Sequence, residues 1–256
     1  MCGKDEVMFE IKERPILFSA PMVRAILSGQ KTVTRRVVKV QPFDLSWSRR
    51  DHRFEYMAGR ALNGDEIDGF YACSTRSGGE WSAKCPYGQP GDRLWVRETW
   101  SDVNLQGAPG IAYRADGDVR DLMEDASFLD EGGAFNYDDP RSKPYQFACW
   151  SEDLLGGKEG RWRPSIHIPR WASRILLEIT AVRVERLQDI SEDQAKAEGI
   201  RLYTDHAELG EWWHVDGIET YSADPRKSFE LLWTSVGGDW NSNPWVWVVE
   251  FKRVTT

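Results

Sequence analysis

Apolar and polar residues alternate in several short stretches of the chain, which is the pattern of strands with one buried face. This alternation predicts strands within residues 15–20, 33–40, 90–100, 173–187 and 244–254, and two shorter ones near 70–73 and 81–84. Helices are predicted only as short segments, and strands and helices do not alternate along the chain. We therefore expect an α+β fold, a small mixed β-barrel with short helices packed on it.

Three short helices are marked by the residues at their ends. They are predicted between Ser19 and Gly29, between Ser191 and Gly199, and from the Asp224-Pro225 pair to Gly237. Ser191 and Gln194 form a capping-box pattern, in which each residue satisfies a free backbone amide of the other. Glycine directly after the last turn is typical of a helix end.

The segments between these elements are irregular and rich in polar residues. We expect one domain over residues 1–256, with insertions at about 41–90, 101–160 and 201–223. Glycines, an Asp-Asp-Pro sequence and poor periodicity predict that 101–160 is a long loop or a partly ordered excursion. The last insertion is expected to be a polar loop.

Length and composition exclude several classes of protein. With 256 residues the chain can bury a core without disulfides, and no apolar run approaches the length of a membrane span. The first residues contain no apolar segment typical of a secretion signal, so we expect a cytoplasmic protein with no membrane partner. The four cysteines form no C-x-x-C pair and are expected to be reduced thiols. We expect neither a metal site nor a cofactor.

The net charge of −8 is unevenly distributed. Residues 116–139 contain nine acids and one arginine, so this segment carries the whole net charge and the rest of the chain is neutral. The acidic segment is a candidate surface for a protein partner or a mimic of nucleic-acid charge. Two stretches without acids, 31–39 and 161–174, contain four basic residues each and could contact phosphates.

The first candidate for chemistry follows the first helix, where Lys31, Thr34, Arg35 and Arg36 come close together in sequence. On a strand, Thr34 and Arg36 share one face and Arg35 takes the other. Lys31 would oppose Thr34 on a straight strand, so the two converge only if the turn at 30–32 redirects Lys31. A purely structural interpretation is also open, because a cation after a helix end complements the helix dipole.

Two glutamates are candidate acids or bases. Glu198 lies in the last turn of a predicted helix, where a carboxylate opposes the helix dipole at a cost of about 0.3–1 kcal/mol. A local rule broken without visible compensation is a hint of function. Its rival is Glu98, which alternation places among apolar side chains of the strand at 90–100. Ser165 and His167 would share a strand face, but a nucleophile pair also needs an orienting acid.

The residues Gly29-x-Lys31-x-x-x-x-Arg36 resemble the G-x-K-x-x-x-x-R signature of ASCH domains, relatives of the PUA RNA-binding fold. The order of an early helix, this motif, a GDxLxVxE strand and a last strand like WVVEF is also similar to that family. The resemblance covers about half of the chain, in residues 15–40, 90–100, 161–200 and 225–254. It implies a PUA-like β-barrel with short peripheral helices and long loop insertions, as in larger ASCH proteins of phages and prophages.

A small bacterial branch of that family removes the acyl group of N4-acetylcytidine with a lysine, a threonine three residues later and a glutamate in a later helix. Lys31, Thr34 and Glu198 stand at the matching positions, although this chain is more than twice as long. The resemblance implies an amidohydrolase in which Lys31 is the base, Thr34 the nucleophile and Glu198 the proton shuttle. We expect substrate-binding side chains at Arg35, Arg36, Trp95, Glu98, His167, Arg170 and Trp171.

Two alternatives remain open on the sequence. The chain could be a non-catalytic RNA- or DNA-binding module, in which Lys31, the neighbouring arginines and those of 161–174 contact phosphates and some of the thirteen tryptophans stack on bases. A ribonuclease using His167 and Lys31 is a variant of this hypothesis. The chain could also be a phage accessory protein that binds a protein partner through residues 116–139.

Overall fold

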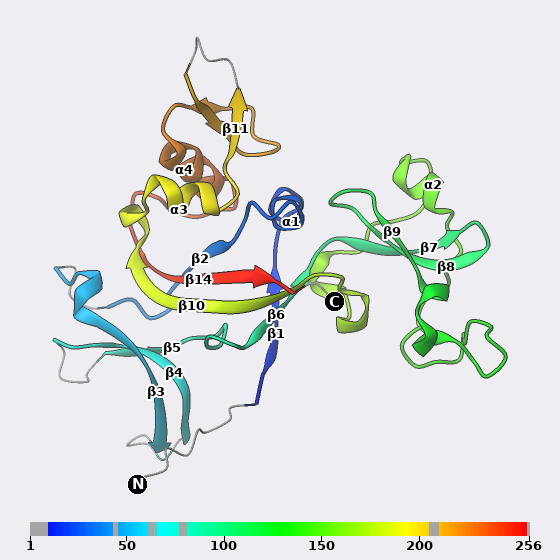
Figure 1. Cartoon of the computed structure of the whole chain (residues 1–256), viewed down its shortest axis with the longest axis horizontal. Helices are drawn as coiled ribbons and strands as arrows, with labels where there is room; N and C mark the ends of the chain where they lie inside the picture. The colour runs from blue at the N-terminus through cyan, green and yellow to red at the C-terminus, as the bar shows by residue number, and fades with distance from the viewer. Residues whose placement is uncertain are drawn as a thin grey trace, which may run out of the picture. The chain divides into compact units, whose positions relative to one another are not determined.

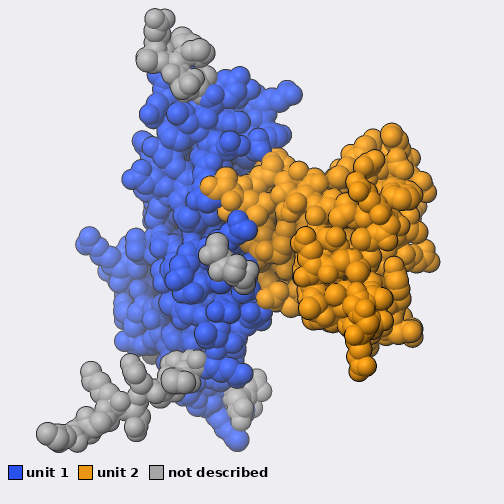
Figure 2. Space-filling view, turned by 45° about the vertical axis from the view of Figure 1, so that its right-hand side comes forward, with its two compact units in different colours: residues 1–14, 29–94, 176–256 blue, residues 15–28, 95–175 orange. Residues whose placement is uncertain are grey.

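The structure is a computed structural model that describes residues 10–42, 46–60, 64, 66–76, 81–204 and 210–254. The chain forms two compact units, coloured separately in Figure 2. Unit 1 consists of Met1–Arg14, Gly29–Leu94 and Leu176–Thr256, and unit 2 of Pro15–Ser28 and Trp95–Ile175. The elements are mostly antiparallel sheets with a few short helices (Figure 1), which confirms the α+β class.

The largest sheet has five strands in the order β1-β6-β10-β14-β2. Their bounds are Glu13–Leu17, Arg93–Arg97, Leu176–Arg186, Trp245–Arg253 and Val33–Val37, in that order. Four of them lie within segments for which the alternation predicts a strand, and β1 overlaps the predicted segment 15–20 but begins two residues before it. Trp245 and Trp247 of β14 are buried and contribute to the core of unit 1.

The expected barrel does not close among the described strands, because β1 and β2 are both edges of this sheet. The backbone that leads into β2 bonds to a helix instead of to a further strand, with the Thr32 amide 2.9 Å from the Ala197 carbonyl oxygen. The prediction of a barrel was therefore wrong for the described part of the chain, which forms open sheets.

Unit 1 contains two further three-stranded sheets. One is formed by β3 (His52–Arg60), β4 (Glu66–Ser74) and β5 (Ser82–Lys84), and the other by β11 (Arg201–Thr204), β12 (Trp212–His214) and β13 (Tyr221–Ser222). The predicted strands near 70–73 and 81–84 fall in β4 and β5. Strand β3 was not predicted, and the prediction of a loop throughout 201–223 was wrong, because β11, β12 and β13 lie in it.

Unit 2 contains a sheet of β7 (Trp100–Leu105), β8 (Ala108–Tyr113) and β9 (Val119–Asp121). The prediction of a long loop over 101–160 was therefore wrong. Acidic side chains hold this region to its own backbone. Asp121 accepts a hydrogen bond from the Met123 amide, and Asp125 one from the Ser127 amide. Aspartates that cap turns in this way order a segment whose composition is typical of disorder.

Three helices begin and end close to the predicted residues, namely α1 (Ala20–Leu27), α3 (Glu192–Ala197) and α4 (Pro225–Ser235). The fourth, α2 (Ser151–Leu155), lies in the segment predicted to be a loop and was not predicted. Both bonds of the capping box at α3 are present, since Gln194 N lies 3.3 Å from Ser191 Oγ and Ser191 N lies 3.0 Å from Gln194 Oε1. Gly199 has a φ of 100°, a conformation that favours glycine at a helix end.

The remaining turns are single 3-10 segments. They are η1 (Arg49–Asp51), η2 (Leu122–Glu124), η3 (Ala126–Phe128), η4 (Ser165–His167), η5 (Arg170–Ala172) and η6 (Leu187–Asp189). Because η4 is a helical turn, the expectation that Ser165 and His167 share a strand face was wrong. None of the helices formed by described residues is long and apolar enough to cross a membrane.

Candidate active site

Lys31 lies in the turn before β2 and is buried, with 2% of its surface exposed. Its Nζ donates hydrogen bonds to Glu198 Oε2 at 2.6 Å and to the Glu198 carbonyl oxygen at 2.9 Å. The turn is tied to the end of α3 by the Thr32 amide and by Gln30, whose Nε2 donates to the Ile200 carbonyl oxygen at 2.6 Å. These backbone contacts fix the two partners, which are 167 residues apart in the sequence.

Glu198 is the C-cap residue directly after α3 and is also buried. Besides the bond to Lys31, its Oε1 accepts a hydrogen bond from Arg35 Nη1 at 3.1 Å. Two cations therefore compensate the unfavourable interaction of this carboxylate with the helix dipole. The contacts with Lys31 and Arg35 therefore explain why a carboxylate lies at the C-terminal end of a helix, which is the feature that made Glu198 a candidate.

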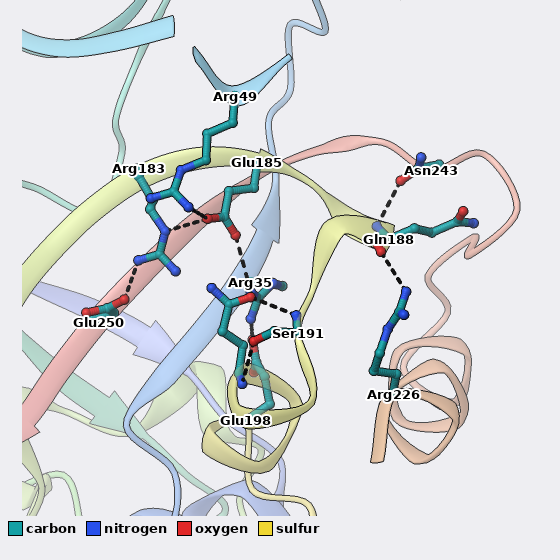
Figure 3. Close-up of polar contacts among 11 residues, drawn as sticks. Arg35, Arg49, Arg183, Glu185, Gln188, Ser191, Glu198, Arg226, Asn243 and Glu250 are labelled. Carbon is teal, nitrogen blue, oxygen red and sulfur yellow. Dashed lines mark hydrogen bonds and ion pairs between the residues drawn. The ribbon is translucent and has the colours of Figure 1, made fainter. Parts of the chain in front are cut away.

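A chain of alternating charges continues from Arg35 (Figure 3). Arg35 Nη2 lies 2.9 Å from Gln194 Oε1 and 3.4 Å from Glu185 Oε2. Glu185 is 2% exposed and also accepts from Arg183 Nε at 2.6 Å and from Arg49 Nη1 at 2.9 Å. The network thus runs from the buried Lys31 to Arg49, whose side chain is 60% exposed.

The pKa of Lys31 lies below its usual value, chiefly because burial disfavours the charged amine. The charge and hydrogen bond of Glu198 oppose this effect, and the nearby Arg36 and Arg35 add to it. A lysine with a lowered pKa supplies more neutral amine near physiological pH, and the neutral amine is the form that accepts a proton.

Thr34 and Arg36 lie on the other face of β2. Thr34 is paired with Val249 and Arg35 with Val248, and side chains of successive strand residues point to opposite faces. Lys31 reaches Glu198, the carboxylate that Arg35 also binds. Thr34 is buried too, with 3% of its surface exposed. The structure brings together Lys31, Glu198 and Arg35, and the pleat of β2 places Thr34 on the face opposite to Arg35.

The other predicted binding residues belong to unit 2. Trp95 is buried in β6, with the Arg97 guanidinium 4.7 Å from the centre of its ring, and His167 lies in η4. Arg170 and Trp171 are in η5, where the Trp171 ring contacts Phe128 and Tyr145. These four positions remain predictions as substrate contacts.

Glu98, the rival carboxylate, is engaged in a different way. It is 1% exposed and accepts two hydrogen bonds from Arg174, from Nε at 3.0 Å and from Nη2 at 2.9 Å. Arg174 also binds Asp116 and Asp118 at 2.8–2.9 Å, and its guanidinium lies 4.1 Å from the Tyr113 ring centre. This arrangement is that of a structural ion-pair cluster within unit 2.

The two basic stretches are partly neutralised inside the protein. In residues 31–39, Lys31 and Arg35 are buried in ion pairs with Glu198. In residues 161–174, Arg163 pairs with Asp102, and Arg174 with the acids named above. At least four of the eight bases are therefore engaged in ion pairs within the protein, which weakens the argument for a phosphate-binding surface at these stretches. Nucleic-acid binding remains a prediction.

Sequence reasoning missed three members of the network: Arg49, Arg183 and Glu185. A local signal was present, because Arg183 and Glu185 are two residues apart and share one face of a strand. Their partner Arg35 could not be found in this way, because it lies two strands away in the sheet.

Within the described residues, no group of three or more His, Cys, Asp or Glu side chains could hold a metal ion. The described cysteines, Cys73, Cys85 and Cys149, are free thiols, whereas Cys2 lies outside the described residues. Comparison with models of protein families, with curated proteins and with solved structures gives no match.

Proposed function

We propose that the chain is an ASCH-type protein with a PUA-like fold that acts in the cytoplasm as an amidohydrolase. Its substrate would be N4-acylated cytidine or a related modified nucleobase. The observation that carries this proposal is the buried 2.6 Å contact between Lys31 Nζ and Glu198 Oε2. The family resemblance selects these two residues without any spatial information, and they lie in direct contact.

In the proposed reaction the Thr34 hydroxyl attacks the acyl carbonyl carbon and gives its proton to the neutral amine of Lys31. The proton passes along the short hydrogen bond to Glu198 and from there to the departing N4 amine as the C–N bond breaks. Water then hydrolyses the acyl ester on Thr34 and releases the carboxylic acid. Arg35 holds the Glu198 carboxylate toward Lys31 through its bond to the second oxygen.

Lys31→Ala is expected to reduce the release of cytidine from N4-acetylcytidine by about 10²–10⁴-fold, because the proton acceptor is lost. Chromatography of the products measures the turnover. The matched control is Lys39→Ala, an exposed lysine of the same basic stretch, which should keep wild-type turnover. Full turnover in a folded Lys31→Ala variant would remove Lys31 from the mechanism.

The nucleophile needs its own test, because Thr34 lies on the face of β2 opposite to Arg35. Thr34→Ala should abolish turnover, whereas Thr34→Ser, which keeps a hydroxyl, should retain part of it. If Thr34→Ala remains active, a water molecule activated by Lys31 is the attacking group. That outcome would remove the role of Thr34 and leave the acid–base pair in place.

The pH dependence of the reaction follows from the lowered pKa of Lys31. The neutral amine is the active form, so kcat/KM should rise with pH and level off below 10.5, the usual pKa of lysine. Initial rates between pH 6 and 10 would measure this profile. A rate that falls as the pH rises would show that the neutral amine of Lys31 is not the active form.

A further inference from the structure

A cavity of about 220 Å³ opens beside the exposed end of the charge network in unit 1. It is lined by Arg49, His52, Arg53, Phe54, Ala72, Arg183 and Val184. Three of these described residues carry guanidinium groups and none carries a carboxylate. We call this cavity the arginine pocket.

Two of the arginines are held in place by other groups. Arg183 donates from Nε to Glu185 and from Nη1 to Glu250, and Arg49 Nη1 contacts Glu185 (Figure 3). The start of η1 is fixed by the Ser48 amide, which donates to Asp51 Oδ2 at 2.7 Å. Positions that are fixed before a ligand arrives reduce the entropy lost on binding.

These contacts leave hydrogen-bond donors of the pocket available. A guanidinium has five N–H groups, and the contact of Arg49 with Glu185 involves only Nη1. Arg53 pairs through Nε with Glu55 of its own strand. The side chains of Arg49 and Arg53 are 60% and 64% exposed, so their remaining donors are accessible to a ligand.

The charges of the pocket arginines are balanced by nearby carboxylates, so the case for an anion rests on the donors that remain and on their geometry. Glu185 pairs with Arg49 and Arg183, Glu250 with Arg183, and Glu55 with Arg53. A planar carboxylate can accept both of its strong hydrogen bonds from one guanidinium group. A tetrahedral phosphate has more oxygens and can accept hydrogen bonds from several guanidinium groups at once. Phe54, Ala72 and Val184 form an apolar wall, which strengthens charge interactions at its surface.

We propose that the arginine pocket binds a phosphate group, with Arg49, Arg53 and Arg183 donating hydrogen bonds to its oxygens. The site is independent of the amidohydrolase proposal, because none of these arginines takes part in that mechanism. The phosphate group can belong to free inorganic phosphate or to a nucleotide.

Calorimetric titration of the full chain with sodium phosphate at constant ionic strength tests the site. Wild-type protein should bind one phosphate saturably, and the double variant Arg49→Gln/Arg53→Gln should bind at least tenfold more weakly. Arg60→Gln removes an exposed arginine of the same strand β3 that does not line the pocket, and it should bind as the wild type does. Circular dichroism checks that each variant is folded.

Titration with adenosine monophosphate and with adenosine, neither of which is a product of the proposed amidohydrolase, distinguishes the two sources of the phosphate group. Tighter binding of the nucleotide than of phosphate identifies a nucleotide site, and equal binding identifies a site for the phosphate group alone. The proposal is overturned if the wild type binds neither phosphate nor nucleotide saturably, if the double variant binds them as well as the wild type, or if adenosine binds as tightly as its monophosphate.

Discussion

Replacing Glu198 with alanine is expected to lower the free energy of unfolding of unit 1 by about 3–5 kcal/mol. Glu198 is the shared partner of Lys31 and Arg35, and the side chains of both cations are fully buried. Without the carboxylate they have lost their common counter-charge in a region from which water is excluded. Removing one partner of a buried ion pair is strongly destabilising, because the other charge stays buried without a counter-charge. Replacing both partners with apolar residues of similar volume is much less destabilising.

Urea denaturation of Glu198→Ala beside Glu192→Ala would measure this effect. Glu192 is an exposed residue in the first turn of the same helix, so its loss should change stability by about 0.5 kcal/mol or less. The double variant Lys31→Met/Glu198→Leu removes both charges and should recover part of the lost stability. A loss below about 1 kcal/mol in Glu198→Ala would mean that water or another anion reaches the two cations.

The amide variant Glu198→Gln separates the structural role of Glu198 from its chemical role. Glutamine retains the size of the side chain and an oxygen that accepts a hydrogen bond from Lys31 or Arg35. It cannot, however, carry a proton from Lys31 to a leaving amine. A folded Glu198→Gln variant that has lost turnover would support proton transfer, and one with full turnover would leave Glu198 a purely structural residue.

The sequence was informative where the signal is local. Ser191 and Gln194 predicted the start of α3, and the Asp224-Pro225 pair that of α4, because each cap depends on residues two or three positions apart. The strands of the large sheet followed from alternation. The contact of Lys31 with Glu198 had no local signal, and only the family resemblance selected both residues.

The partners of Arg35 show why the rest could not be predicted. Arg35 and Arg183 are paired with the same residue of β14, Val248, one on each side. This register is decided by pairing between strands about 150 residues apart, and it sets which charges share a face of the sheet. The prediction of a long loop around the acidic residues 116–139 was wrong for a related reason. Its aspartates are typical of disorder in composition, but several bind the backbone of their own turns.

Arg174→Met is expected to destabilise unit 2 by about 3–5 kcal/mol, the cost of breaking a buried pair by removing one partner. Arg174 is the joint partner of the buried Glu98 and of the more exposed Asp116 and Asp118. Methionine fills much of the volume but leaves Glu98 without its counter-charge. The exposed Arg114 of the same unit provides the control, since Arg114→Met should leave stability nearly unchanged.

The loss of stability in Arg174→Met should grow as the pH rises. Burial already raises the pKa of Glu98 above 4.5, and Arg174 is the main group that opposes this effect. Without Arg174 the pKa in the folded state moves further above that of the unfolded chain. Between these two pKa values the folded state binds more protons, so its stability falls with increasing pH.

Urea denaturation at pH 5 and pH 8 therefore tests whether this arginine holds an ionised Glu98 in the fold. The difference in the free energy of unfolding between Arg174→Met and wild type should be larger at pH 8. At that pH the folded variant must either bury an unpaired Glu98 carboxylate or protonate it, and both lower its stability. The pKa of Asp116 lies below its usual value of 3.8, so this carboxyl is ionised at both pH values and does not contribute to the difference. An equal loss at both pH values would show that Arg174 stabilises unit 2 by packing against Tyr113 and not through the charge of Glu98.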